Sequence, residues 1–148
     1  MPDAARTLES RASVLDLTLT GDLAAVAPVR DRIMGFIEER GVADEQAIDI
    51  MVALQEALVN AVLHGCKNDP SQVIRCSVEV DSDAVTIVIR DPGEGFESAA
   101  VTDSSDDGVN LTNHGRGIFL MRGLMDEVGY SHGGSEITLK KQRHPQAA

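Results

Sequence analysis

The chain has 148 residues, of which 43% are hydrophobic and 3% aromatic, and 24 acidic against 13 basic residues give a formal net charge of −11. This size suits a single domain, residues 1–148, with an aliphatic core. The acidic balance argues against direct binding of nucleic acid, which needs a basic surface. We find no apolar run long enough to cross a bilayer and no secretory signal in the first residues, so we expect a cytoplasmic protein without membrane contact.

The first half of the chain predicts a strand followed by two helices. Residues 13–20 alternate apolar and polar side chains, which indicates a strand. Residues 23–40 carry apolar residues at helical spacing, and Pro28 places the true start of that helix near itself. The longest helix is expected over residues 44–65, with an acidic first turn and Gly65 as its stop. Because most of its faces are apolar, we expect it to be buried between other elements.

The second half predicts two hairpins on either side of a long polar segment. Residues 97–114 are rich in Ser, Asp and Asn and too long for an ordinary connection, which indicates a lid or a disordered stretch. Residues 1–10 and 142–148 are expected to be frayed ends. Together the elements predict an α+β two-layer sandwich, in which one mixed or antiparallel sheet carries the helices on one face. Its later strands are expected at residues 73–80, 84–90, 127–131 and 136–141.

Three polar residues interrupt the apolar surface of the long helix. Glu56, Asn60 and His64 stand four residues apart, so they form one stripe. A buried carboxylate and a buried carboxamide are costly without partners. The stripe therefore faces either polar groups of the protein or a ligand. Cys66 and Cys76, which follow the helix, are expected to be free thiols, although their spacing also allows a disulfide.

Two short glycine-rich loops flank the polar segment. In DPGEGF, Asp91 follows a strand and either accepts a hydrogen bond from an exocyclic amine or caps the turn. In HGRGIF, Gly115 and Gly117 precede a helix, where backbone N–H groups attract phosphate and no Cβ blocks its approach. Arg116 adds either a local cation or an ordinary exposed arginine.

The order of these motifs resembles the GHKL ATP-binding superfamily, which includes gyrase, Hsp90, histidine kinases and MutL. The shared pattern is E-x-x-x-N on a helix, D-x-G-x-G after a strand, a polar lid, G-x-G opening a helix and a late G-x-x-x-T. In detail, EALVNAVLHG, IRDPGEGF and HGRGIFLMRGLMDEV are similar to the small anti-sigma-factor serine-protein kinases of bacteria. The resemblance covers residues 23–141 and implies the two-layer Bergerat fold with a flexible ATP lid.

The resemblance also implies a role for each matched residue. Asn60 would coordinate Mg²⁺ bridging the nucleotide phosphates, and Glu56 would be the general base for the attacking hydroxyl. Asp91 would accept the adenine amino group, and Thr138 on the last strand would complete the adenine pocket. The wall beside the adenine would be formed by Gly93 and Gly95. The phosphates would be bound beneath the lid by Gly115, Arg116, Gly117 and Ile118.

The implied function is an ATP-dependent serine/threonine protein kinase that is also an anti-sigma factor. Its cofactors would be ATP and Mg²⁺, and its partners a sigma factor, a STAS-type antagonist that it phosphorylates and a second copy of itself. A complete sensor histidine kinase is not expected, because no phosphoacceptor domain precedes the ATP domain. One departure from the family is that no lysine or arginine lies between Arg90 and Arg116. The alternative is therefore a nucleotide-gated binding protein without significant phosphoryl transfer.

Overall fold

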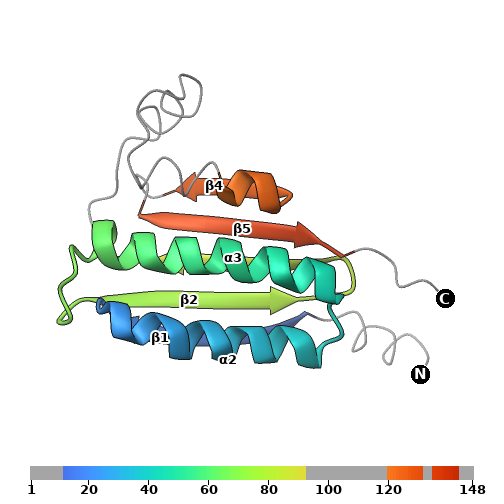
Figure 1. Ribbon diagram of the computed structural model, residues 1–148, viewed down its shortest axis with the longest axis horizontal. Helices are drawn as coiled ribbons and strands as arrows, with labels where there is room; N and C mark the ends of the chain where they lie inside the picture. The colour runs from blue at the N-terminus through green and yellow to red at the C-terminus, as the bar shows by residue number, and fades with distance from the viewer. Residues whose placement is uncertain (1–11, 93–119, 132–134, 144–148) are drawn as a thin grey trace, which may run out of the picture.

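The computed structural model describes residues 12–92, 120–131 and 135–143, and within them two helices cover one face of a sheet (Figure 1). The sheet has five strands in the order β1-β2-β3-β5-β4, and every neighbouring pair is antiparallel. The predicted α+β sandwich with helices on one face is confirmed. The strands are β1 (Ser13–Thr20), β2 (Val73–Val80), β3 (Ala84–Arg90), β4 (Glu127–Ser131) and β5 (Glu136–Gln142).

Alternation along the strands gives the sheet a helix-facing side and an open side. On β5, Ile137 and Leu139 are buried in the core, whereas Thr138 between them is half-buried. Directly paired residues of antiparallel strands share a face, so Thr138 and its partner Val88 on β3 both lie on the open side. This division decides which residues of each strand can reach a site beside the helices.

The first helical segment is divided into two parts. A 3₁₀ turn, η1 (Leu23–Ala25), leads into α2 (Val26–Glu39). Pro28 lies in the first turn of α2, where its missing N–H leaves no helical hydrogen bond unmade. Gly41 has a φ of 78°, a conformation that ends a helix at little cost for glycine. The helix therefore begins near Pro28, as predicted.

The long helix changes its hydrogen-bond pattern near its end. The α-helix α3 (Asp44–Asn60) continues into a π-helical turn, η2 (Ala61–Gly65). In this turn the Cys66 N–H donates to the carbonyl of Ala61, five residues back, at 2.8 Å. The span predicted for the helix is confirmed, but the π-helical turn was not foreseen. Such turns occur often at functional sites.

The helix ends at Gly65, as predicted, but Gly65 does not supply the left-handed turn that follows the helix. Among the described residues, the positive φ angles that follow this helix belong to Lys67 and Asn68, at 53° and 56°. The Asn68 N–H donates to the carbonyl of Val62 at 2.8 Å, which closes the helix end. The chain is therefore turned by two non-glycine residues in the left-handed region, and Gly65 is needed for another reason, given below.

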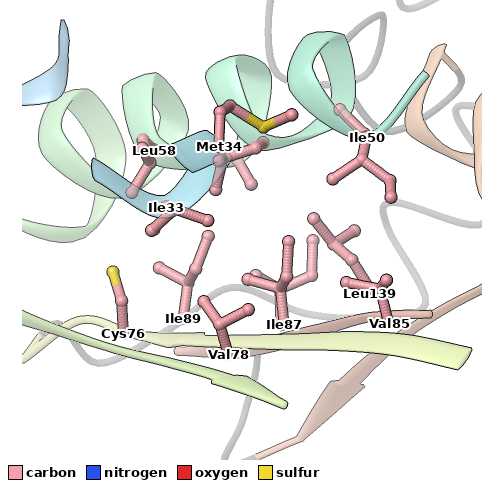
Figure 2. Packing of buried hydrophobic residues seen from close by; sticks show 14 of the residues in the cluster. Ile33, Met34, Ile50, Leu58, Cys76, Val78, Val85, Ile87, Ile89 and Leu139 are labelled. Atoms are coloured by element: carbon pink, nitrogen blue, oxygen red, sulfur yellow. The ribbon is translucent and has the colours of Figure 1, made fainter. Parts of the chain in front are cut away.

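The core lies between the sheet and the helical segments, which include residues 120–124 as well as α2 and α3 (Figure 2). Ile33 of α2 and Ile50 and Leu58 of α3 point toward the strands, and Met34 of α2 lies at the level of the helices. Burial of each such side chain stabilises the fold by about 1.5–3 kcal/mol. The core is aliphatic, as the composition predicts, and it holds α3 against one face of the sheet. On the strand side the labelled residues are Cys76, Val78, Val85, Ile87, Ile89 and Leu139.

Two expectations about the chain are wrong in part. By length and composition, the helix Asp44–Gly65 could cross a membrane, contrary to the expectation that no such run exists. In the fold it covers the sheet, and buried core helices pass the same test. The C-terminal end expected to fray from residue 142 is ordered at its start. Gln142 belongs to β5, and the Arg143 guanidinium donates to the carbonyl of Asp81 at 2.8 Å.

Candidate functional site

The predicted polar stripe of α3 holds two half-buried residues at its C-terminal end. Glu56 and Asn60 are both half-buried and lie one turn apart, whereas His64 in the π-helical turn is exposed. Residues four apart in a helix differ by only about 40° in direction, so Glu56 and Asn60 face the same way. The structure thus keeps these two together and gives His64 a more exposed setting.

The carboxamide of Asn60 has a buried atom with no hydrogen bond. Its Nδ2 has no partner among the described residues. An unsatisfied buried polar group costs about 1–3 kcal/mol, so it indicates a place for a ligand. Rotation of the amide by about 180° exchanges its nitrogen and oxygen. That rotation presents an oxygen, the ligand type that Mg²⁺ prefers.

The described residues contain no cluster of three or more His, Cys, Asp or Glu side chains that could hold a metal ion. Mg²⁺ in phosphoryl-transfer sites typically uses one or two protein oxygens together with substrate phosphates and water. Asn60 as a single protein ligand fits this mode of binding. The residues present therefore fit a magnesium ion that arrives with a nucleotide.

Asp91 lies against the end of the helix that carries Asn60. A Cβ added to Gly65 would be 2.2 Å from Asp91 Cγ and 2.3 Å from Oδ2, closer than real Cβ contacts. Only glycine at position 65 therefore leaves room for this carboxylate. The Asp91 N–H donates to the carbonyl of Ser135 at 2.9 Å, which holds Asp91 at the end of β3. The sequence analysis explained Gly65 as a helix stop and did not predict this contact.

The structure does not bring Thr138 to this site, and that expectation is corrected. Thr138 pairs with Val88 and Gly129 on the open side of the sheet. Asp91 continues the helix-facing side of β3, because it lies two residues after the buried Ile89. The residue beside Asp91 is Ser135, which is buried and follows the late glycine pair directly. The alternation of β5 thus separates Thr138 from the side of the sheet on which Asp91 lies.

The remaining predicted binding residues lie outside the described part of the chain, as does the predicted lid over residues 97–114. The described site therefore consists of Glu56, Asn60 and Asp91, with Gly65 and Ser135 fixing Asp91. The predictions that lie outside it are Gly93, Gly95, Gly115, Arg116, Gly117 and Ile118.

Cys66 follows the π-helical turn directly and is buried in the core. Burial raises the pKa of its thiol, and the carboxylates of Asp91 and Asp69 raise the pKa further. A Cβ added to Gly21 would be 2.6 Å from Cys66 Cβ and 2.5 Å from the carbonyl oxygen of Asp69. The turn between β1 and α2 therefore closes tightly on the segment that follows the π-helical turn. Cys66 and Cys76 are both buried free thiols, as expected.

The free energy of unfolding is expected to fall as the pH rises above about 9. Burial raises the pKa of Cys76 from 9.0 to about 12, and burial raises the pKa of Cys66 and Tyr130 as well. In this range the unfolded chain loses protons that the folded protein retains, so deprotonation favours unfolding. Urea titrations at pH 8 and pH 10.5 measure the fall. In Cys76→Val, where residue 76 cannot ionise, the free energy of unfolding should fall less between these two pH values. An equal fall would contradict the raised pKa of Cys76.

The fold is a two-layer α+β domain in which the Asn60 carboxamide and the Asp91 carboxylate lie near one end of a buried helix. The family model described as "Histidine kinase-like ATPase domain" matches residues 19–141. The chain belongs to this family, and the resemblance found in the sequence is confirmed.

The chain has relatives of similar size among characterised proteins. It is 30% identical over 118 residues to the anti-sigma F factor of Anoxybacillus flavithermus, an alignment that covers 78% of this chain and 81% of the relative. It is 29% identical over 142 residues to the serine-protein kinase RsbW of Staphylococcus epidermidis, which covers 90% of this chain and 89% of the relative.

Among solved structures, the fold is similar to the RsbU and RsbW domains of Rv1364c from Mycobacterium tuberculosis, with a TM-score of 0.59 and 22% identity. The match covers 90% of this chain and 33% of that one, so this chain spans about a third of that protein. At this identity the likeness concerns the fold alone.

Proposed function

We propose that the protein is an ATP-dependent serine/threonine protein kinase that also acts as an anti-sigma factor. The observation that carries the proposal is that three polar groups follow one another along the C-terminal part of the long helix. They are the half-buried Glu56, the buried Asn60 Nδ2, which has no hydrogen-bond partner among the described residues, and the Asp91 carboxylate, which lies against Gly65. The names of the relatives, an anti-sigma F factor and a serine-protein kinase, support the same function.

In this proposal each described residue has one task. Asp91 accepts a hydrogen bond from the adenine amino group, and the Ser135 carbonyl holds Asp91 in place. Asn60 binds Mg²⁺, which supplies charge neutralisation at the phosphates when bound. Glu56, one turn before Asn60, accepts the proton of a partner's serine or threonine hydroxyl. The hydroxyl oxygen bonds to the γ-phosphorus as the bond from that phosphorus to the bridging oxygen breaks, and ADP leaves.

The kinase is proposed to phosphorylate a STAS-type antagonist. It is also proposed to bind a sigma factor and thereby keep that factor from RNA polymerase. The test is incubation with Mg²⁺, γ-labelled ATP and candidate STAS proteins, followed by gel separation. Transfer of label to a serine or threonine of a STAS protein is the expected result. Absence of transfer to every candidate, despite tight nucleotide binding, would contradict the kinase proposal.

The second candidate function is a nucleotide-gated binding protein without phosphoryl transfer. It is favoured by the absence of lysine and arginine between Arg90 and Arg116, since a basic side chain there would neutralise the γ-phosphate. In this case ATP would change the affinity for the sigma factor and no label would move. Sigma-factor binding measured with ATP, with ADP and without nucleotide, beside the labelling experiment, separates the two functions.

A homodimer is also part of the proposal. The edge position of β1 in the sheet supports the use of the first strand in pairing, because edge strands present backbone groups that can join another chain. Sedimentation equilibrium at micromolar concentration should give twice the mass of the chain. A monomer at all concentrations would remove the dimer from the proposal.

Asn60→Ala is expected to weaken Mg-ATP binding by at least about 10-fold, the scale of losses seen when metal sites are perturbed. Because Asn60 Nδ2 makes no hydrogen bond with the described residues, its removal should change the free energy of unfolding by less than about 1 kcal/mol. Isothermal titration with Mg-ATP and urea unfolding measure the two effects. Thr138→Ala, on the open side of the sheet, is the matched control and should bind as the wild type does. Tight Mg-ATP binding by Asn60→Ala would contradict the metal assignment.

A further inference from the structure

We propose that Lys141 is a positioning residue for phosphoryl transfer. It clamps the helical residues 120–124, which follow the predicted phosphate-binding residues 115–117, to the stripe of α3 that carries Glu56. The inference rests on the proposed kinase function and adds a residue to it. Lys141 is a charged residue on the helix-facing side of the sheet, where most side chains are apolar.

Lys141 occupies a helix-facing position at the end of β5. The alternation of this strand puts Lys141 on the same side as the buried Ile137 and Leu139, and its side chain is only 14% exposed. Among the helix-facing positions of the five described strands, it is the one charged residue. An ammonium group removed from water is costly unless it is paired. Its partners therefore indicate why a lysine is placed there.

The ammonium group joins three elements of the fold. Lys141 Nζ lies 3.1 Å from Asp49 Oδ2 on α3 and donates to the carbonyl of Leu124 at 2.6 Å. Leu124 is the last of the helical residues 120–124, and carbonyls at a helix C-terminus have no partner within the helix. A cation at this end is also favoured by the helix dipole. Lys141 thus donates hydrogen bonds both to a carbonyl at one helix end and to a carboxylate of α3.

Other contacts hold the same helix end to β5. The Asp126 N–H donates to the carbonyl of Lys140 at 2.9 Å, and the Gln142 N–H donates to Asp126 Oδ2 at 2.6 Å. Met121 and Met125 are buried in the core. The C-terminal end of the helix is therefore held in place, and Lys141 connects it by hydrogen bonds to Asp49 of α3.

The two ends of this clamp lead to the proposed chemistry. Asp49 and Glu56 are seven residues apart on α3, so they differ by about 20° in direction and share one stripe. The helical residues 120–124 begin three positions after Gly117, the last residue of the segment proposed to bind phosphate. Lys141 therefore fixes the element that carries the general base relative to the element that follows the phosphate-binding segment. An error of about 1 Å in such an alignment costs about 100-fold in rate.

The test compares Lys141→Met with Lys140→Met in the full chain. Lys140 is the adjacent lysine on the open side, where it lies 3.6 Å from the Glu127 carboxylate. Lys141→Met is expected to lower kcat for transfer by about 10–100-fold. The KM for ATP should change much less, because the adenine is held at the other end of α3. Lys140→Met should keep the wild-type kcat, and Lys141→Arg, which keeps the cation, should recover part of the loss.

A merely structural role would lower the free energy of unfolding and leave kcat of the folded protein unchanged, which would overturn the proposal. An equal fall in kcat for Lys140→Met would also overturn it. If the wild type transfers no phosphate, the proposed function fails separately, and the clamp is then judged by hydrogen exchange with ADP bound. Faster exchange of the amides of residues 121–125 in Lys141→Met than in Lys140→Met supports the clamp, and equal exchange overturns it.

Discussion

Glu56→Gln is expected to reduce phosphoryl transfer by about 10²–10⁴-fold while nucleotide binding persists. Glutamine keeps the size and the half-buried position of the side chain but cannot accept the hydroxyl proton at neutral pH. The loss should therefore lie in kcat, with the affinity for Mg-ATP within about threefold of the wild type, because the proposed binding contacts are made by Asn60 and Asp91. Single-turnover transfer to a STAS protein and titration with Mg-ATP measure the two quantities.

Glu79→Gln is the matched control for this experiment. Glu79 is an exposed residue of β2 on the open side of the sheet, so the same chemical change there should leave transfer unaltered. A Glu56→Gln variant that transfers phosphate at the wild-type rate would show that Glu56 is not the base. Loss of transfer together with loss of binding would instead assign Glu56 to the binding of nucleotide.

Gly65→Ala is expected to weaken adenine-nucleotide binding by about 10–100-fold. The new methyl group would overlap the Asp91 carboxylate, at 2.2 Å from Cγ, and also Asp91 Cβ, at 2.6 Å. The Cβ of the new alanine is fixed to the backbone of the helix and cannot rotate away from Asp91. Asp91 must therefore move. A lost hydrogen bond to a charged group costs about 1.5–3 kcal/mol, which corresponds to this change in affinity. Titration with ADP, which lacks the γ-phosphate, measures the effect on the adenine end of the site.

Gly35→Ala provides the comparison for the same substitution. Gly35 lies inside α2, and a Cβ there meets nothing within 4 Å. Alanine is favoured over glycine in a helix by about 1 kcal/mol, so this variant should be as stable as the wild type or more stable, with unchanged affinity. Gly65→Ala should in addition lose about 1–3 kcal/mol of stability through overpacking. Wild-type ADP affinity in Gly65→Ala would contradict the proposed role of Asp91.

The strands and the main helices were predictable because each repeats a local pattern. Residues 13–20, 73–80 and 84–90 alternate strictly enough that their predicted bounds agree with β1, β2 and β3. The π-helical turn at Ala61–Gly65 was not predictable, because the same apolar residues fit an α-helix equally well. The end of the helix at Gly65 was predicted, but the left-handed turn at Lys67 and Asn68 was not, because neither residue is a glycine.

The site was predictable only where a motif carried it. Asn60 and Asp91 were found because they stand in the motifs E-x-x-x-N and D-x-G-x-G, which resemble those of the family. Ser135 was missed because its place beside Asp91 depends on the pairing of β3 with β5, which joins residues far apart in the chain. The role of Gly65 and the contacts of Lys141 were missed for the same reason. Contacts of this kind are set by the packing of whole elements, and no local pattern reports them.

The central claim is that an adenine nucleotide binds at the end of α3, between Asn60 and Asp91. A crystal structure with Mg²⁺ and a non-hydrolysable ATP analogue tests it most directly. We predict the adenine amino group within hydrogen-bond distance of the Asp91 carboxylate and the magnesium ion coordinated by the Asn60 side-chain oxygen. A nucleotide bound elsewhere, or the protein's own side chains filling the space beside Asn60 and Asp91, would contradict the claim.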